Sequence, residues 1–124
     1  MCEDFVCCPR PALRERPLLT VEQASDLENM FKILANDTRL RILHAIIKGT
    51  EMCVTDIANL LEMKPQAISN QLQRLVDLRI VDSRREGNNV YYRIVDPCVV
   101  SLLDLGICLT EESPAPPPLR KGGE

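Results

Sequence analysis

The fold of this chain is decided by residues 53–77, which read CVTDIANLLEMKPQAISNQLQRLVD. Apolar side chains recur there every three or four positions, in 57–61 and again in 68–76, and this is the spacing of one face of an α-helix. Pro65 suits the first position of a helix, where its missing N–H group costs nothing. The segment therefore predicts two consecutive short helices, the first over about 54–61 and the second beginning at Pro65.

Further helices are predicted on both sides of this segment. The same apolar spacing runs over 21–35 and over 37–49, with Asp37 as the N-cap of the second of these helices. A last helix is expected over about 97–110, and it is apolar nearly all round. A helix of this kind in so small a protein needs partners on more than one side. We therefore expect the chain to form a homodimer.

The hydrophobic period changes after the two short helices. Residues 80–84 and 90–95 are rich in β-branched and aromatic side chains, and they flank the segment 86–89, which contains Gly and Asn. Both residue types tolerate the positive φ that a hairpin tip requires. Two short helices followed by a hairpin predict a winged helix-turn-helix, which is a mainly α fold with a small β-hairpin in the order αααα-ββ-α.

Composition divides the chain into three parts. We expect residues 1–19 to form a flexible arm that carries cysteines, 20–112 to form a DNA-binding and dimerisation domain, and the Pro-rich segment 113–124 to be disordered. No stretch is long and apolar enough for a membrane span, and the acidic N-terminus does not resemble a secretory signal. A cytoplasmic location is therefore expected. In that reducing compartment, six cysteines suit metal binding or redox chemistry better than a disulfide framework.

Basic residues gather in the part of the chain that a winged helix presents to double-stranded DNA. The whole chain has a net charge of −3, but 64–85 contain five basic and two acidic residues and are therefore net positive. Such a local face can engage phosphates, because charges farther away than about 8 Å are screened. Asn and Gln pair with adenine, whereas Lys and Arg bind phosphate or guanine. The side chains expected to contact DNA are Lys64, Gln66, Ser69, Asn70, Gln71, Gln73, Arg74, Arg84, Arg85 and Asn88.

Four stretches, 31–43, 53–58, 66–72 and 84–92, together resemble the ArsR/SmtB metal-sensing repressors, and the likeness extends over about 24–112. The resemblance implies a homodimer paired through its first and last helices, which binds operator DNA without metal and releases it when metal binds. The sequence departs from the family pattern at the second short helix. Lys64 replaces the usual Ser at its cap, and Asn70-Gln71 replace a pair of histidines.

The resemblance also suggests where a metal ion would bind. Cys53 matches the first cysteine of the family's Cys-Val-Cys string, whose second cysteine is Thr55 here. Family members with a site near this helix borrow cysteines from an N-terminal arm. The first candidate site is therefore a cup of three thiolates, from Cys7, Cys8 and Cys53, with Cys2 nearby.

A second candidate site lies on the last helix. Family members with a zinc-type site there use Asp-x-His near its start and His-x-x-Glu near its end. Asp96, Cys98 and Glu112 fall on matching positions, and Cys108 precedes the position of the family's histidine by one residue. Thiols in place of imidazoles shift the preference from zinc toward softer ions. A role as a small hydrophobic side chain in an apolar helix is the alternative for Cys53, Cys98 and Cys108.

Sites rich in thiolates favour thiophilic ions, and the expected inducer is Hg(II), followed by As(III), Cd(II) or Pb(II), with no organic cofactor. Release of the repressor by such an ion would derepress resistance genes. One alternative is a winged-helix regulator whose cysteines sense oxidation. A thiol enzyme would use Cys7 or Cys53 as nucleophile and His44 as base, but no catalytic motif accompanies them. We therefore expect that the protein is not an enzyme.

Overall fold

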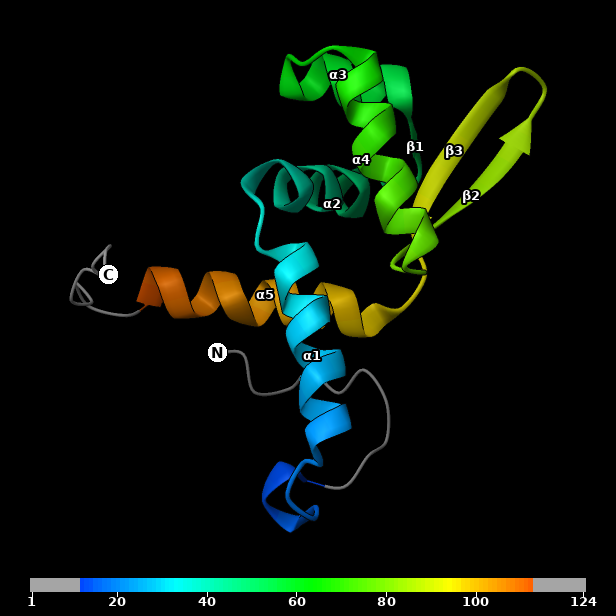
Figure 1. The fold of residues 1–124 in the computed structure, drawn as a ribbon. Coiled ribbons are helices and arrows are strands. Elements are labelled where there is room, and N and C mark those ends of the chain that lie inside the picture. Colours follow the sequence, from blue (N-terminus) through cyan, green and yellow to red (C-terminus); the bar gives the residue numbers. More distant parts are fainter. Residues whose placement is uncertain (1–11, 113–124) are drawn as a thin grey trace.

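The structure, a computed structural model, describes residues 12–112. It is a mainly α fold with a small antiparallel sheet in the strand order β1-β3-β2 (Figure 1). Residues 1–11 of the predicted arm and the predicted tail 113–124 lie outside the described residues. The elements in chain order are η1 (Leu13–Glu15), α1 (Val21–Leu34), α2 (Asp37–Gly49), β1 (Met52–Cys53), α3 (Val54–Leu61), α4 (Pro65–Asp77), β2 (Val81–Glu86), β3 (Asn89–Ile94) and α5 (Pro97–Glu112).

The helix boundaries follow local capping chemistry. Thr20 and Gln23 form a reciprocal capping box at the start of α1. Pro65 is at the first position of α4, as predicted. The predicted N-cap of α2 is wrong by one residue. Asn36 is the cap, because its side-chain Oδ1 accepts the backbone N–H of Arg39 at 3.0 Å, and Asp37 is the first helical residue.

The core lies between α2, α3, α4 and the base of the sheet. Its fully buried side chains are all aliphatic, as the scarcity of aromatic residues predicts. Only Leu34 of α1 is buried in it, so α1 lies largely outside the core, and α5 contributes Val99. The largest fully buried side chains are Ile42, Leu43, Ile46, Ile57, Ile68, Leu72, Leu75 and Val81.

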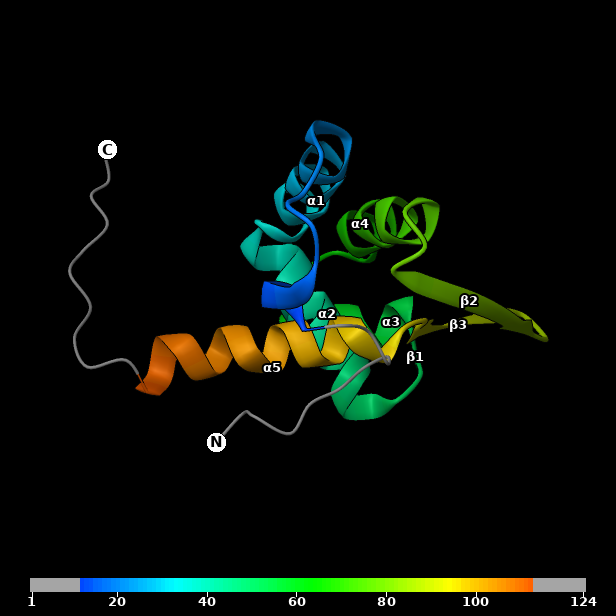
Figure 2. The same ribbon diagram turned by 90° about the horizontal axis from the view of Figure 1, so that it is seen from below.

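The predicted hairpin is confirmed as β2 and β3, which pair antiparallel and project away from the helices as a wing (Figures 1 and 2). The pairing ends at Glu86 opposite Asn89, and Gly87 takes a φ of 65° in the turn between them. The short strand β1 was not predicted. It adds to the other edge of β3, with Met52 opposite Tyr92 and Cys53 opposite Tyr91. The wing is thereby joined to the residues that lead into α3.

Candidate functional site

The predicted DNA-reading residues lie along α4 and at its start. Gln66, Asn70, Gln73 and Arg74 are exposed, and their spacing of three and four residues places them on one side of the helix. Lys64 is the exposed N-cap residue, and its side chain makes no capping hydrogen bond. This end of α4 therefore offers amides and a positive charge to an approaching ligand. Ser69 and Gln71 are half-buried.

Gln71 points into the protein rather than to the exposed side of α4. Its Oε1 accepts a hydrogen bond from Arg39 Nε at 2.7 Å, and Arg39 Nη1 donates to the carbonyl of Ile33 at 3.0 Å. Arg39, on α2, thus connects the end of α1 with the middle of α4. No local sequence pattern predicts this role of Arg39, although the residue lies within the stretch 31–43 that resembles the family.

The other amides of α4 are paired along the helix. Gln66 Nε2 donates to Asn70 Oδ1 at 3.0 Å, and Gln73 Nε2 donates to Asp77 Oδ1 at 2.9 Å. Each pair joins residues four apart, which face each other on consecutive turns. These hydrogen bonds therefore favour one orientation of each side-chain amide in the free protein.

Arg84 of the wing is held by two carboxylates. Its guanidinium lies 2.6 Å from Glu51 Oε1 and 2.7 Å from Glu86 Oε1, and its Cζ lies 5.2 Å from the centre of the Tyr91 ring. The hydrogen bond from Arg84 lowers the pKa of Glu51 below its ordinary 4.5, and the same bond raises the pKa of Arg84. Glu51 and Arg84 are 33 residues apart, so no local spacing predicts the pair. Arg85 and Asn88 are exposed on the same hairpin.

The substitution Glu51→Gln is expected to strengthen DNA binding about two- to fivefold at low salt, because it removes one of the two carboxylates that compete with a phosphate for Arg84. Since the pKa of Glu51 is lowered, the carboxylate is charged at neutral pH. It becomes protonated only as the pH falls through that lowered pKa. The salt dependence of log K should steepen by about 0.9, the value of one added phosphate contact. Fluorescence anisotropy at salt concentrations from about 50 to 200 mM measures both the DNA affinity and its salt dependence.

Asp82→Asn is the matched control for this prediction. It removes the same charge from the wing, where Asp82 faces Arg93 at 3.9 Å, but it leaves the bonds of Arg84 intact. An unchanged salt slope in Glu51→Gln would show that Arg84 does not contact DNA.

Cys53 is the last residue of β1 and the N-cap of α3, as the sequence placed it. It is half-buried and carries a free thiol. The part of the chain that the structure describes contains no group of three or more His, Cys, Asp and Glu side chains that could hold a metal ion. The other members of the first candidate site, Cys7 and Cys8 with Cys2, lie outside the described residues.

The second candidate group lies on and beside α5. Asp96 precedes the helix, and its Oδ1 accepts the backbone N–H of Cys98 at 2.8 Å. Cys98 and Cys108 are half-buried and disulfide-bonded, so each of these sulfurs lies within bonding reach of a second sulfur. Glu112 is the last residue of α5. His44 of α2 is exposed.

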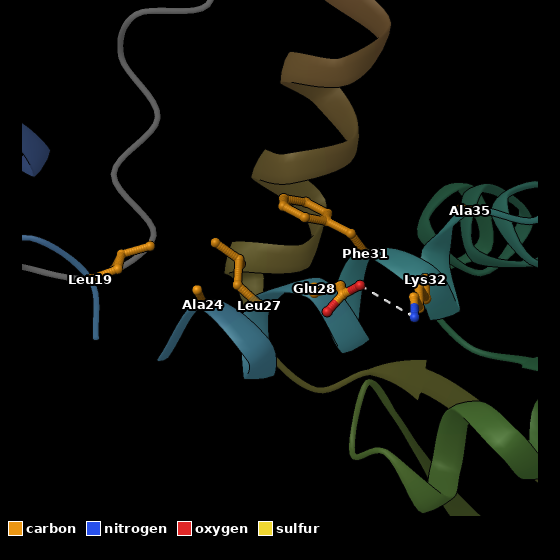
Figure 3. A pocket seen from close by; sticks show the side chains of 7 residues that line it. All are labelled: Leu19, Ala24, Leu27, Glu28, Phe31, Lys32 and Ala35. Carbon is orange, nitrogen blue, oxygen red and sulfur yellow. Dashed lines mark ion pairs between the residues drawn. The ribbon is translucent and has the colours of Figure 1, made fainter. Parts of the chain in front are cut away.

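An apolar surface lies on α1. Leu27 and Phe31 are 42% and 48% exposed, and they project from the same side of the helix over a shallow groove (Figure 3). The neighbouring Glu28 and Lys32 form an ion pair at 3.3 Å. Apolar side chains are also exposed on α5, at Leu105, Ile107 and Leu109. The groove is lined by Leu19, Ala24, Leu27, Glu28, Phe31, Lys32 and Ala35.

The winged helix-turn-helix, with its exposed α4 and its hairpin, can be compared with known proteins. Residues 36–83 match the profile of a family described as "Bacterial regulatory protein, arsR family". The cadmium resistance transcriptional regulatory protein CadC of Listeria innocua is 38% identical over 86 residues, which are 69% of this chain and 72% of that protein. The chain belongs to the ArsR family.

Two solved structures extend the likeness of this ArsR-family chain. The crystal structure of the AntR antimony-specific transcriptional repressor is 55% identical, with a TM-score of 0.75, and the match covers 87% of this chain and 97% of that one. A homodimeric winged helix-turn-helix DNA-binding domain from Mycobacterium bovis is 33% identical, with a TM-score of 0.66, over 78% of this chain and 92% of that one.

The comparisons confirm the predicted fold and the predicted family. The matched relatives are transcriptional regulators, so this member of the ArsR family is a regulator and not an enzyme. Within residues 12–112, no helix combines the length and the apolar character that a membrane crossing needs.

Proposed function

We propose that this ArsR-family protein is a cytoplasmic, homodimeric repressor that binds operator DNA and is released by a thiophilic metal or metalloid ion. The observation that carries the proposal is the exposed, amide-bearing side of α4 beside a wing that carries Arg84 and Arg85. A major groove admits one helix, and a hairpin beside it can reach the backbone or the minor groove. Release of the repressor would derepress genes for resistance to the ion.

The dimer is proposed to form through α1 and α5. Both helices lie at the edge of the core, and both expose large apolar side chains that a second copy would cover. The domain from Mycobacterium bovis is homodimeric, which supports the same assembly here. Two copies related by a twofold axis would present two α4 helices to half-sites at a fixed spacing.

Two groups of cysteines are proposed as sensing sites. The first joins Cys53 to Cys7 and Cys8 of the arm, with Cys2 available as a further ligand. Cys53 is the N-cap of α3, so an ion bound there would act on α3, which packs against α4. The second group is Asp96 and Cys98 at the start of α5 together with Cys108 and Glu112 at its end. About 15 Å of helix separates the two cysteines, so the ligands of one ion would come from both copies of the dimer.

The ion is proposed to be a trivalent metalloid, antimonite or arsenite. The AntR repressor, which is 55% identical to this chain, is antimony-specific, and a trivalent ion of this group suits a pyramid of three thiolates. The sequence alone favoured Hg(II), and the relatives that match this chain include a cadmium resistance regulator. Hg(II), Cd(II) and Pb(II) are therefore the competing ions in the test.

The experiment is an anaerobic titration of the full-length protein on its own upstream DNA under reduction, followed by fluorescence anisotropy. Antimonite, arsenite, Hg(II), Cd(II), Pb(II) and Zn(II) are added in parallel to the wild type, to Cys53→Ser and to Cys98→Ser/Cys108→Ser. Release by antimonite or arsenite in the wild type, lost in one of the two cysteine variants, is expected and identifies the sensing group. Thr55→Ser, an exposed neighbour on α3, is the control and should respond as the wild type does. Binding that no ion disturbs would overturn the metal-sensing proposal.

Oxidation sensing is the second candidate function, and the disulfide-bonded state of Cys98 and Cys108 favours it. In that case a peroxide would oxidise pairs of thiols to disulfides, two electrons and two protons passing from each pair to the peroxide, which is reduced to water. The same anisotropy assay separates the two functions. Release by peroxide that a thiol reductant reverses, together with indifference to every ion, would favour the redox function.

A further inference from the structure

We propose that Asn70 reads an adenine in each operator half-site and that Gln66 is the positioning residue that fixes the Asn70 amide for this contact. The inference rests on the proposed function, because it presumes that α4 enters the major groove. It adds which side chain carries the base specificity and which base that side chain selects.

The hydrogen bond between the two side chains sets the direction of the Asn70 amide. Gln66 Nε2 donates to Asn70 Oδ1 at 3.0 Å, so one lone pair of Oδ1 is used and the second stays available next to the Nδ2 donors. Both residues are exposed in the first two turns of α4, the part of a reading helix that contacts base edges. Asn70 therefore presents an acceptor and a donor side by side.

This pattern selects adenine among the four bases. In the major groove, adenine offers the N7 acceptor and the N6 amino donor, which match the Nδ2 donor and the Oδ1 acceptor of Asn70. Guanine offers two acceptors, N7 and O6, so the Asn70 oxygen would face the O6 oxygen without a hydrogen between them. Cytosine and thymine offer only one hydrogen-bonding group each there, which satisfies half of the amide.

The remaining amides of α4 are less suited to this task. Gln71 is half-buried, and its oxygen is bonded to Arg39 at 2.7 Å. Gln73 donates to the carboxylate of Asp77 at 2.9 Å, farther along the helix, where a negative charge opposes the approach of phosphates. Asn70 is thus the amide of α4 that is exposed, near the start of the helix and bonded only through its oxygen to a neutral partner.

The role of Gln66 is to lower the entropic cost of the contact. A free Asn side chain must be fixed when DNA binds, whereas the Gln66–Asn70 bond holds the amide beforehand. Removal of Gln66 should therefore weaken the discrimination by Asn70 without changing which base is preferred. A purely structural role for Gln66 would instead lower affinity for every sequence alike.

The test uses the full-length protein and the segment of its upstream DNA that the protein protects best in footprinting. Each adenine of a half-site is replaced in turn, symmetrically, by guanine or by 7-deazaadenine, which lacks the N7 acceptor, and binding is followed by fluorescence anisotropy. At one symmetric adenine, both replacements are expected to weaken wild-type binding roughly ten- to hundredfold. Asn70→Ala should be indifferent to both replacements at that position, and Gln66→Ala should keep the preference with a smaller ratio.

Asn59→Ala is the matched control, since it truncates an exposed amide of α3 that is not among the predicted DNA contacts, and it should discriminate as the wild type does. The salt dependence of binding should stay unchanged in all three variants, because no phosphate contact is lost. Discrimination by Asn70→Ala equal to that of the wild type, or its loss in Asn59→Ala, would overturn the inference. A wild-type protein that prefers no upstream duplex over random DNA would overturn the proposed function instead.

Discussion

The double substitution Leu27→Asp/Phe31→Asp is expected to yield a folded monomer whose affinity for operator DNA is about a hundredfold or more below that of the wild type. Both side chains are exposed in the single chain, so their replacement removes little of the buried core, which lies elsewhere. In a dimer joined through α1, the same positions would become buried, and unpaired carboxylates there would be strongly unfavourable.

The loss of affinity is expected because the dimer presents two linked α4 helices to the two half-sites. Once one α4 helix is bound, the second half-site is contacted within the same complex, at a high effective concentration. A monomer loses that advantage and also half of the phosphate contacts, so its salt dependence should become shallower. Analytical ultracentrifugation gives the oligomeric state, circular dichroism gives the fold, and anisotropy gives the affinity.

Ser25→Asp/Asn29→Asp is the matched control for this prediction. It places the same two charges four residues apart on α1, at exposed positions about half a turn away from Leu27 and Phe31. It should remain a dimer and bind DNA nearly as the wild type does. A dimeric Leu27→Asp/Phe31→Asp protein with normal affinity would show that α1 does not form the interface.

Local chemistry explains why most of the fold could be predicted from the sequence. The apolar spacing and Pro65 gave α3 and the start of α4 at the observed residues, since both signals act within a few positions of the chain. Asn36 and Asp37 are both good N-cap residues, so the choice between them depended on which side chain reaches the N–H of Arg39. The strand β1 is two residues long and carries no periodic pattern at all.

The candidate site was predictable in its location but not in its internal bonds. Exposed amides on α4 and arginines on the wing follow from the pattern of the sequence. The partner of Gln71 is 32 residues away on α2, and the partner of Arg84 is 33 residues away before β1. Hydrogen bonds between residues so far apart in the chain depend on how the helices and strands pack. The local patterns of one sequence do not predict that packing.

Arg39→Lys is expected to reduce the effect of the inducing ion on DNA affinity from the usual 5- to 150-fold range of such couplings to about threefold or less. Arg39 bonds to both the end of α1 and the middle of α4, two regions that a sensor of this kind couples. Its Nη1 satisfies the carbonyl of Ile33, which is one of the last four of α1 and has no donor within the helix. Its Nε holds Gln71 in the middle of α4.

A change in the arm or in the dimer interface would reach α4 through this residue. The arm leads directly into α1, and a displacement of the C-terminal end of α1 would move the Arg39 guanidinium together with the Gln71 amide. Lysine keeps the charge, but its single ammonium lacks the planar fork that serves two acceptors at once. In the metal-free state, the operator affinity of the variant should fall only a few-fold, because the aliphatic side chains of the core still hold α4 in place.

Arg41→Lys, an exposed residue of the same helix, is the control and should respond to the ion as the wild type does. Gln71→Ala should reproduce the loss of coupling, and the combination Arg39→Lys/Gln71→Ala should add little, because both changes remove the same bond. The measurements are the affinity of the ion for the free protein, expected to be unchanged, and the DNA affinity with and without the ion. Additive effects, or a normal response in Arg39→Lys, would mean that the signal reaches α4 by another route, such as the packing of α3, whose N-cap is Cys53, against α4.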